Sequence, residues 1–280
     1  MTYRLEVVGN PIAHSLSPMI HQAFAAQFGR DIVYTRQEVA LDGFHAHAEE
    51  FLAAGGYGMN VTVPFKQEAF AFVAQHSPAA QLAGAVNTIC VTDGVSFGHN
   101  TDGIGLINDL TQRWQLPLEG KTVLLLGAGG STRGLLEPLV QAGVGRLMIA
   151  NRTVAKATEL IHMLADRVPA TALALPVSQS ALKAAGIEGQ IDVVINTTSI
   201  GLQAAAELTA LIETPVLAGT FCYDLSYGAN ARFAQLAAPD ARRSVDGLGM
   251  LVEQAAASYH LWFAEQPQTE PVYQALLAHV

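Results

Sequence analysis

The twelve residues KTVLLLGAGGST, at positions 121–132, decide the fold class. The apolar run at 121–126 predicts a buried strand, and Gly127, Gly129 and Gly130 predict a tight turn before a helix that begins at Ser131. A strand, a glycine-rich turn and a helix N-terminus are typical of units that bind the pyrophosphate of a dinucleotide. Thr132 occupies the third glycine position of the usual motif, so the motif alone leaves an ordinary strand-to-helix turn as the alternative. The flanking strand and helix favour dinucleotide binding.

Strand and helix signals alternate in both directions from this stretch. Apolar runs predict strands at 5–9, 32–39, 57–63, 86–91, 95–98, 146–150, 191–196 and 220–225. Helical patterns lie at 17–28, 43–54, 66–75, 78–83, from 153 onward and at 249–265. This alternation predicts an α/β protein with two α/β domains, mostly parallel sheets covered by helices, and a boundary near residues 101–120.

Composition limits the classes of function. The chain has 280 residues, of which 50% are hydrophobic, and a net charge of −9, which argues against nucleic acid and anionic membranes as partners. The mean hydropathy is +0.28, yet no uncharged apolar run is long enough for a membrane span, and the N-terminus lacks the pattern of a secretory signal. Cys90 and Cys222 lie in apolar runs, which favours reduced core thiols in a cytoplasmic protein.

The end of the next strand bears on which dinucleotide is bound. NAD-binding units carry an acidic residue about 20 residues after the glycine turn, where it holds the ribose 2′-hydroxyl. Here the chain reads Asn151-Arg152-Thr153, with Lys156 one turn further on, and no carboxylate is present. Two cations at a helix N-terminus oppose the helix dipole unless an anion lies between them, which disfavours a merely solvated basic turn. This pattern predicts NADP, with its 2′-phosphate bound here, rather than NAD.

A candidate catalytic pair lies earlier in the chain. Lys66 is the sole lysine of the first 120 residues and follows a strand, as does Asp102 in Asn100-Thr101-Asp102-Gly103. If these strand ends converge, the ammonium and carboxylate could perform general acid–base work beside a hydride transfer. The alternative is a surface lysine and a carboxylate that caps a helix.

Small polar groups flank this pair in the sequence. Ser15 and Ser17 lie at a strand-to-helix turn that suits a carboxylate ligand, although Ser17 could simply cap the helix. Thr62 and Asn87 lie at strand ends that point toward the same edge, and Gln254 lies on the last long helix.

These motifs together resemble those of the shikimate dehydrogenases. The stretches that carry the resemblance are GNPIAHSLSP at 9–18, NVTVPFK at 60–66, GAVNT at 84–88, NTDG at 100–103, GAGG at 127–130, NRT at 151–153 and DGLGM at 246–250. Members of that family are oxidoreductases that act on a CH–OH donor: they reduce 3-dehydroshikimate to shikimate with NADPH, in the pathway to chorismate and the aromatic amino acids. The chain departs from the family pattern at Leu16, His99, Leu225 and 228–232, which leaves fine substrate selectivity open.

The resemblance implies a role for each matching position. Lys66 and Asp102 would be the catalytic pair, and the substrate would be held by Ser15, Ser17, Thr62, Asn87, Tyr227 and Gln254. NADP would be held by Gly127, Ala128, Gly129, Gly130, Ser131, Asn151, Arg152, Thr153, Lys156, Leu225 and Gly247. No metal site is expected.

The resemblance also implies a domain plan. Residues 1–102 plus 247–280 would form a discontinuous substrate domain, and 103–246 a Rossmann-like NADP domain, with the cleft between them. Two alternatives stay open: an NAD-preferring quinate/shikimate dehydrogenase, and a non-catalytic sensor of NADP or a ring acid. The expected ligands are small molecules, and the expected state is a monomer or homodimer.

Overall fold

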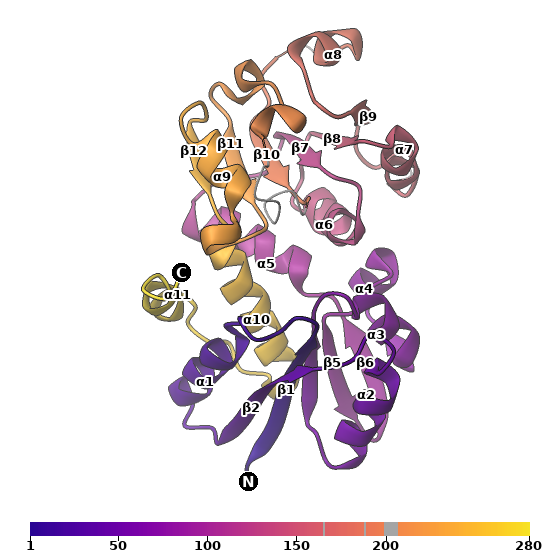
Figure 1. The fold of residues 1–280 in the computed structure, drawn as a ribbon, viewed down its shortest axis with the longest axis vertical. Helices are drawn as coiled ribbons and strands as arrows, with labels where there is room; N and C mark the ends of the chain where they lie inside the picture. The colour runs from indigo at the N-terminus through magenta and orange to yellow at the C-terminus, as the bar shows by residue number, and fades with distance from the viewer. Residues whose placement is uncertain (165, 188, 199–206) are drawn as a thin grey trace. The chain divides into compact units, whose positions relative to one another are not determined.

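The computed structural model describes residues 1–164, 166–187, 189–198 and 207–280, and it divides the chain into two compact units (Figure 1). The first unit contains 1–106 and 251–279, and the second contains 107–250 together with Val280. The chain therefore leaves the first unit after Leu106 and returns to it at Leu251. Within the described residues, no helix is both long and apolar enough to cross a bilayer.

The first unit is built on a six-stranded sheet in the order β2-β1-β3-β5-β6-β4. Its strands are β1 (Tyr3–Gly9), β2 (Ile32–Glu38), β3 (Gly58–Val61), β4 (Gln75–His76), β5 (Thr88–Thr92) and β6 (Val95–His99). β1 runs parallel to both β2 and β3, and β4 runs parallel to β6, whereas β5 is antiparallel to β3 and β6. The sheet is thus mostly parallel, with one antiparallel hairpin whose turn residues Asp93 and Gly94 have φ values of 52° and 76°.

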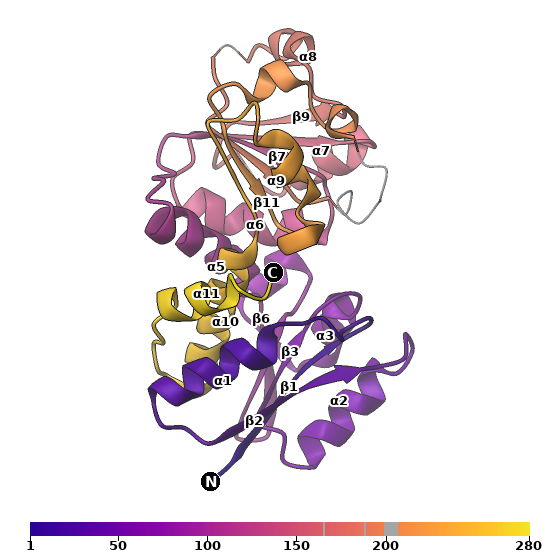
Figure 2. The same ribbon diagram turned by 60° about the vertical axis from the view of Figure 1, so that its left-hand side comes forward.

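Helices cover both faces of this sheet. The helices that belong wholly or for most of their length to this unit are α1 (Ser17–Gln27), α2 (Phe44–Ala53), α3 (Lys66–Phe72), α4 (Pro78–Ala83), α5 (Asp102–Asn108), α10 (Leu248–Phe263) and α11 (Glu270–Leu276). α1 and α10 lie on one side, where Val7 and Trp262 belong to one core cluster (Figure 2). α2 and α3 lie on the other, where Val8 packs with Phe44 and Phe65. Val7 and Val8 face opposite clusters because successive strand side chains alternate.

The second unit is built on an all-parallel sheet in the order β12-β11-β10-β7-β8-β9. Its strands are β7 (Thr122–Leu126), β8 (Arg146–Asn151), β9 (Ala170–Ala174), β10 (Val193–Asn196), β11 (Phe221–Asp224) and β12 (Arg243–Val245). In chain order within the unit, this arrangement is 3-2-1-4-5-6, the strand order of the doubly wound dinucleotide-binding fold. The order reverses between β7 and β10, so the glycine turn after β7 lies where such folds bind their ligand.

The helices of the second unit include a π-helix that continues α5. They are the π-helix (Asp109–Arg113), α6 (Gly130–Gln141), α7 (Val154–His162), α8 (Gln179–Ala184), α9 (Arg232–Ala237) and short 3₁₀ turns at Leu208–Ala210, Thr214–Leu217 and Gly228–Asn230. α9 covers one face of the sheet through Phe233 and Ala237 (Figure 2). Successive strand residues, whose side chains point to opposite faces of the sheet, are both fully buried, as Leu124 and Leu125 show. This is expected for a parallel sheet covered on both faces.

Both cysteines are free and buried, which confirms the predicted core thiols. Burial raises the pKa of the Cys90 thiol to about 12 and that of Cys222 to about 11.

Candidate active site

Lys66 and Asp102 meet at the carboxyl end of the first sheet. Lys66 is the first residue of α3, just after β3, and Asp102 is the first residue of α5, just after β6. Their Nζ and Oδ2 atoms are 2.6 Å apart, and the side chains are 28% and 17% exposed. The amide N–H of Asp102 donates to Asn100 Oδ1, so the Asn100 side chain satisfies a free N–H group at the start of α5. The Asp102 carboxylate is therefore not needed as a cap and contacts Lys66 instead. The pair is therefore partly buried yet open to a small molecule.

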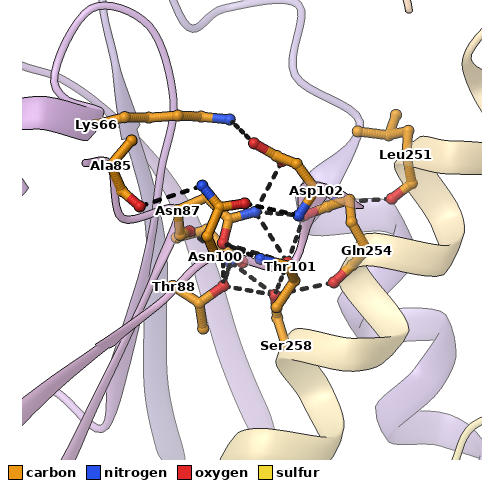
Figure 3. A network of polar contacts seen from close by, with 11 residues as sticks. Lys66, Ala85, Asn87, Thr88, Asn100, Thr101, Asp102, Leu251, Gln254 and Ser258 are labelled. Atoms are coloured by element: carbon orange, nitrogen blue, oxygen red, sulfur yellow. Dashed lines mark hydrogen bonds and ion pairs between the residues drawn. The ribbon is translucent and has the colours of Figure 1, made fainter. Parts of the chain in front are cut away.

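Asn87 holds the other oxygen of the same carboxylate (Figure 3). Its Nδ2 donates to Asp102 Oδ1 at 2.9 Å, and the Gln254 Oε1 atom lies 3.5 Å from that nitrogen. Gln254 comes from α10, so three separate chain segments converge at the Asn87 amide, and Lys66 adds a fourth. The structure thus brings Lys66, Asp102, Asn87 and Gln254 into one polar cluster.

The two serines lie together at the start of α1. Ser15 Oγ donates to Ser17 Oγ at 3.1 Å and accepts the Ser17 amide N–H at 3.3 Å. The N-cap of α1 is Leu16, so Ser17 is not the cap, and its hydroxyl is directed to Ser15. Two hydroxyls beside a helix N-terminus suit an anionic ligand group.

Backbone contacts place the end of β1, from which the serine loop departs, beside the segment that leads to Lys66. The Asn10 N–H donates to the Val63 carbonyl, and the Thr62 N–H donates to the Val8 carbonyl. A Cβ on Gly9 would lie 2.6 Å from the methyl carbon of Thr62, so only glycine allows this close approach. Thr62 is half-buried there.

Behind the cluster lies a layer of buried polar groups that the sequence did not assign to the site. Asn60 Nδ2 reaches Thr88 Oγ1 and Ser258 Oγ at 3.1 and 3.2 Å, and the Tyr34 hydroxyl donates to Asn60 Oδ1 at 2.7 Å. One signal was available: Ser258 follows Gln254 by four residues, which places both on the same face of a helix.

In the second unit, the turn after β7 has the shape of a phosphate cradle. Gly127 has a φ of 111° and donates its N–H to the Ala150 carbonyl at 2.7 Å, which fixes the turn against β8. Within the described ranges of the chain, Cβ atoms added at Gly129 or Gly130 would meet nothing within 4 Å. Packing against these described residues therefore does not require glycine at the two positions, whereas a ligand pressed against the backbone would.

Thr132 explains the departure from the usual glycine spacing. It is fully buried, and its hydroxyl donates to the Gly127 carbonyl at 2.9 Å and contacts the Thr197 hydroxyl at 2.7 Å. The hydroxyl thus ties α6 to the turn. Ala128 is half-buried and Ser131 is exposed in the same turn.

The end of β8 presents positive charge. Arg152, Thr153 and Lys156 are exposed around the start of α7, and Asn151 Nδ2 donates to the Thr153 carbonyl. The first turn of α7 has no acidic residue, and neither Arg152 nor Lys156 has an ion-pair partner within the described part of the chain. The donor set therefore fits a phosphate group next to the glycine turn.

The three remaining predicted residues also lie in the second unit. A Cβ on Gly247 would lie 2.4 Å from the Leu225 carbonyl oxygen, so glycine permits this contact after β11. Tyr227 is half-buried, two residues further along the same loop. It belongs to the second unit, unlike the other predicted substrate residues.

Family models match most of the chain. Residues 7–89 match the shikimate dehydrogenase substrate binding domain, 109–206 match shikimate / quinate 5-dehydrogenase, and 247–277 match the shikimate 5'-dehydrogenase C-terminal domain.

Individual relatives agree with these models. The chain is 45% identical to the shikimate dehydrogenase (NADP(+)) of Alkalilimnicola ehrlichii, over 99% of both chains. It superposes on the Ael1 enzyme of Pseudomonas putida with a TM-score of 0.88, at 39% identity over 98% of both chains. A shikimate 5-dehydrogenase from Thermus thermophilus, solved with NADP(H) and shikimate, gives a TM-score of 0.79 at 26% identity, over 99% of this chain and 100% of that one.

Proposed function

The chain belongs to the shikimate dehydrogenase family and reversibly reduces 3-dehydroshikimate to shikimate with NADPH, and we propose that Lys66 and Asp102 move the proton in this reaction. The enzyme serves the pathway to chorismate and the aromatic amino acids. The observation that carries the assignment of the pair is the 2.6 Å contact between the Lys66 ammonium and the Asp102 carboxylate.

Each member of the pair has a separate task. Reduction of the ketone leaves an alkoxide oxygen that needs a proton, and oxidation of the alcohol releases the same proton. The Lys66 Nζ is the donor and acceptor of this proton. Asp102 holds the ammonium with one carboxylate oxygen, while its other oxygen is fixed by Asn87. The carboxylate thus orients Lys66 and compensates its charge.

The residues around the pair bind the substrate. The hydroxyls of Ser15 and Ser17 receive the carboxylate of the substrate, and Thr62, Asn87 and Gln254 hydrogen-bond its ring oxygens. Tyr227, from the second unit, contributes a further polar contact. The adjacency of Ser15 and Ser17 and the convergence of Asn87 and Gln254 on Asp102 support these roles.

NADP binds to the second unit and, when bound, supplies or accepts the hydride. The residues that hold it are Gly127, Ala128, Gly129, Gly130, Ser131, Asn151, Arg152, Thr153, Lys156, Leu225 and Gly247. The open glycine turn suits the pyrophosphate, and the exposed cations at Arg152 and Lys156 suit the adenosine 2′-phosphate.

The units take the corresponding roles. Residues 1–102 and 247–280 form the substrate domain, and 103–246 form the NADP domain. The compact units of the structure divide after Leu106 and after Met250, so each proposed boundary lies four residues earlier in the chain. The buried free thiols support a cytoplasmic location. Small molecules are its ligands, and its state is a monomer or homodimer.

The test is an absorbance assay at 340 nm with shikimate or quinate as substrate and NADP or NAD as cofactor. We expect the cofactor to be reduced fastest when shikimate and NADP are combined. Lys66→Ala should lower kcat by about 10²–10⁴-fold, the usual contribution of a general acid–base.

The matched control is Lys121→Ala. Lys121 also forms an ion pair with a carboxylate, to Asp192 at 2.9 Å, but in the second unit and outside the proposed site. It should retain wild-type turnover. Absence of any reaction with shikimate and NADP would refute the function, and near-normal turnover of Lys66→Ala would refute the role of Lys66.

A further inference from the structure

Two buried hydroxyls, those of Thr88 and Ser258, lie directly behind the catalytic cluster (Figure 3). Both side chains have no solvent exposure, and their Oγ atoms are 2.7 Å apart. Thr88 begins β5 and Ser258 lies on α10, so the contact joins the sheet to the helix that carries Gln254. Neither hydroxyl belongs to the residues assigned above to substrate or cofactor.

The orientation of the neighbouring Asn87 amide is fixed by its surroundings. The backbone N–H of Thr101 is an obligatory donor and lies 2.9 Å from Asn87 Oδ1. The oxygen of the amide must therefore face Thr101, which turns the NH₂ group toward Asp102 Oδ1 at 2.9 Å. A flipped amide would set two donors against each other and two acceptors against each other.

The direction of the Thr88 hydroxyl follows from this orientation. Thr88 Oγ1 lies 3.0 Å from Asn87 Oδ1, which accepts and so receives the single hydroxyl hydrogen of Thr88. The Ser258 hydroxyl has two oxygens within reach, Thr88 Oγ1 at 2.7 Å and the Gln254 backbone carbonyl at 3.0 Å, so it joins Thr88 to the backbone of α10. The contacts link Ser258 to Thr88 and Thr88 to Asn87, where Thr88 donates to the amide oxygen, and the Asn87 NH₂ donates to Asp102. Successive hydrogen bonds of this kind polarise one another in a buried site.

From this chain of contacts we propose that Thr88 and Ser258 are positioning residues for the proton transfer: their hydroxyl pair holds the Asn87 amide, which holds the Asp102 carboxylate against Lys66. The proposal rests on the proposed function. Its physical basis is that Asp102 can orient Lys66 only if its own rotation is restrained, and the Asn87 NH₂ restrains it from the side opposite the ammonium.

The test uses Thr88→Val and Ser258→Ala, which remove each hydroxyl with little change in shape. We expect each variant to lose about 10-fold in kcat, because a small displacement of catalytic groups costs up to about 100-fold and Thr101 still holds part of the amide. The KM for NADP should not change. The pH profile of kcat should change, because the group that transfers the proton is held less firmly by its carboxylate.

The matched control is Thr220→Val. Thr220 is also fully buried, and its hydroxyl donates to the Leu217 carbonyl at 2.8 Å, but it lies in the second unit. It should lose stability as Thr88→Val does, while kcat and the pH profile stay as in the wild type.

A double variant tests whether the two hydroxyls act in series. Removal of both Thr88 and Ser258 hydroxyls should cost no more kcat than removal of one. Folded Thr88→Val and Ser258→Ala proteins with the kcat and pH profile of Thr220→Val would overturn the proposal, as would independent, multiplicative losses in the double variant. If Thr88→Val does not fold, Ser258→Ala alone decides the matter. Activity of the wild type with shikimate and NADP separates failure of this proposal from failure of the proposed function.

Discussion

His21 should make the first unit acid-sensitive. It lies in α1 with no solvent exposure, and its ring stacks on Tyr34 at 4.5 Å and 9°. Within the described part of the chain, neither ring nitrogen has a hydrogen-bond partner. Burial lowers the pKa of His21 from 6.5 to about 3, and the nearby Asn60 amide opposes this shift only in part. The folded protein therefore keeps His21 neutral where the unfolded chain protonates it.

The sign and size of the effect follow from the two pKa values. Because the folded pKa is the lower one, the unfolded state binds more protons below pH 6.5, and stability falls as the pH falls. At pH 5 the unfolded histidine is almost fully protonated and the folded one almost fully neutral. The difference amounts to about 1.5 pKa units, or about 2 kcal/mol of unfolding free energy.

The measurement is urea unfolding at pH 7.5 and pH 5.0 for the wild type and His21→Phe. Phenylalanine keeps a stacked ring but cannot take up a proton. Trp262, whose ring lies 5.2 Å from His21, reports on the first unit by fluorescence, and a Trp114→Phe background removes the other tryptophan.

The quantity that matters is the loss of stability between the two pH values. It should be about 2 kcal/mol larger in the wild type than in His21→Phe, because the contributions of all other titrating groups cancel in the comparison. Equal losses in the two proteins would show that His21 is hydrated or paired in solution and would refute the reasoning.

Two further predictions concern the second unit. Arg152→Ala should raise the KM for NADP about 10-fold or more relative to any change in the KM for NAD, since a charge-assisted contact to the 2′-phosphate would be lost; equal changes would contradict that role. Asp109→Ala should lower the unfolding free energy by about 3–5 kcal/mol. The buried Asp109 carboxylate accepts hydrogen bonds from Arg113, Trp114 and Tyr223, and a loss under about 1 kcal/mol in urea unfolding would contradict its structural importance.

The long buried elements of the fold were predictable from the sequence because their signals are local. The apolar run before the glycine turn became β7, and the pattern at 249–265 became α10. The short strands β4, β9 and β12 were not predicted, since two to five residues at or near a sheet edge carry little periodicity. The antiparallel pairing of β5 with β3 could not be predicted from the sequence either, because it depends on long-range packing rather than on the Asp93-Gly94 turn.

The site was predictable where one residue type carries the chemistry. Lys66 was conspicuous as the sole lysine of its region, and the absence of a carboxylate after Asn151 favoured a phosphate. The cap alternatives could be decided only by geometry. Leu16 precedes α1 as its N-cap, and Asn100 serves the start of α5, so the side chains of Ser17 and Asp102 are directed elsewhere.

The supporting residues were hidden for a different reason. Thr88 lies within an apolar strand and Ser258 within an alanine-rich helix, where a small hydroxyl residue is compatible with ordinary packing. Their significance depends on which way the Asn87 amide faces, and that orientation is set by the Thr101 backbone N–H, which has no sequence signature. A positioning network of this kind can therefore be found only by assigning every donor and acceptor around a catalytic group, beginning with a group whose role is fixed.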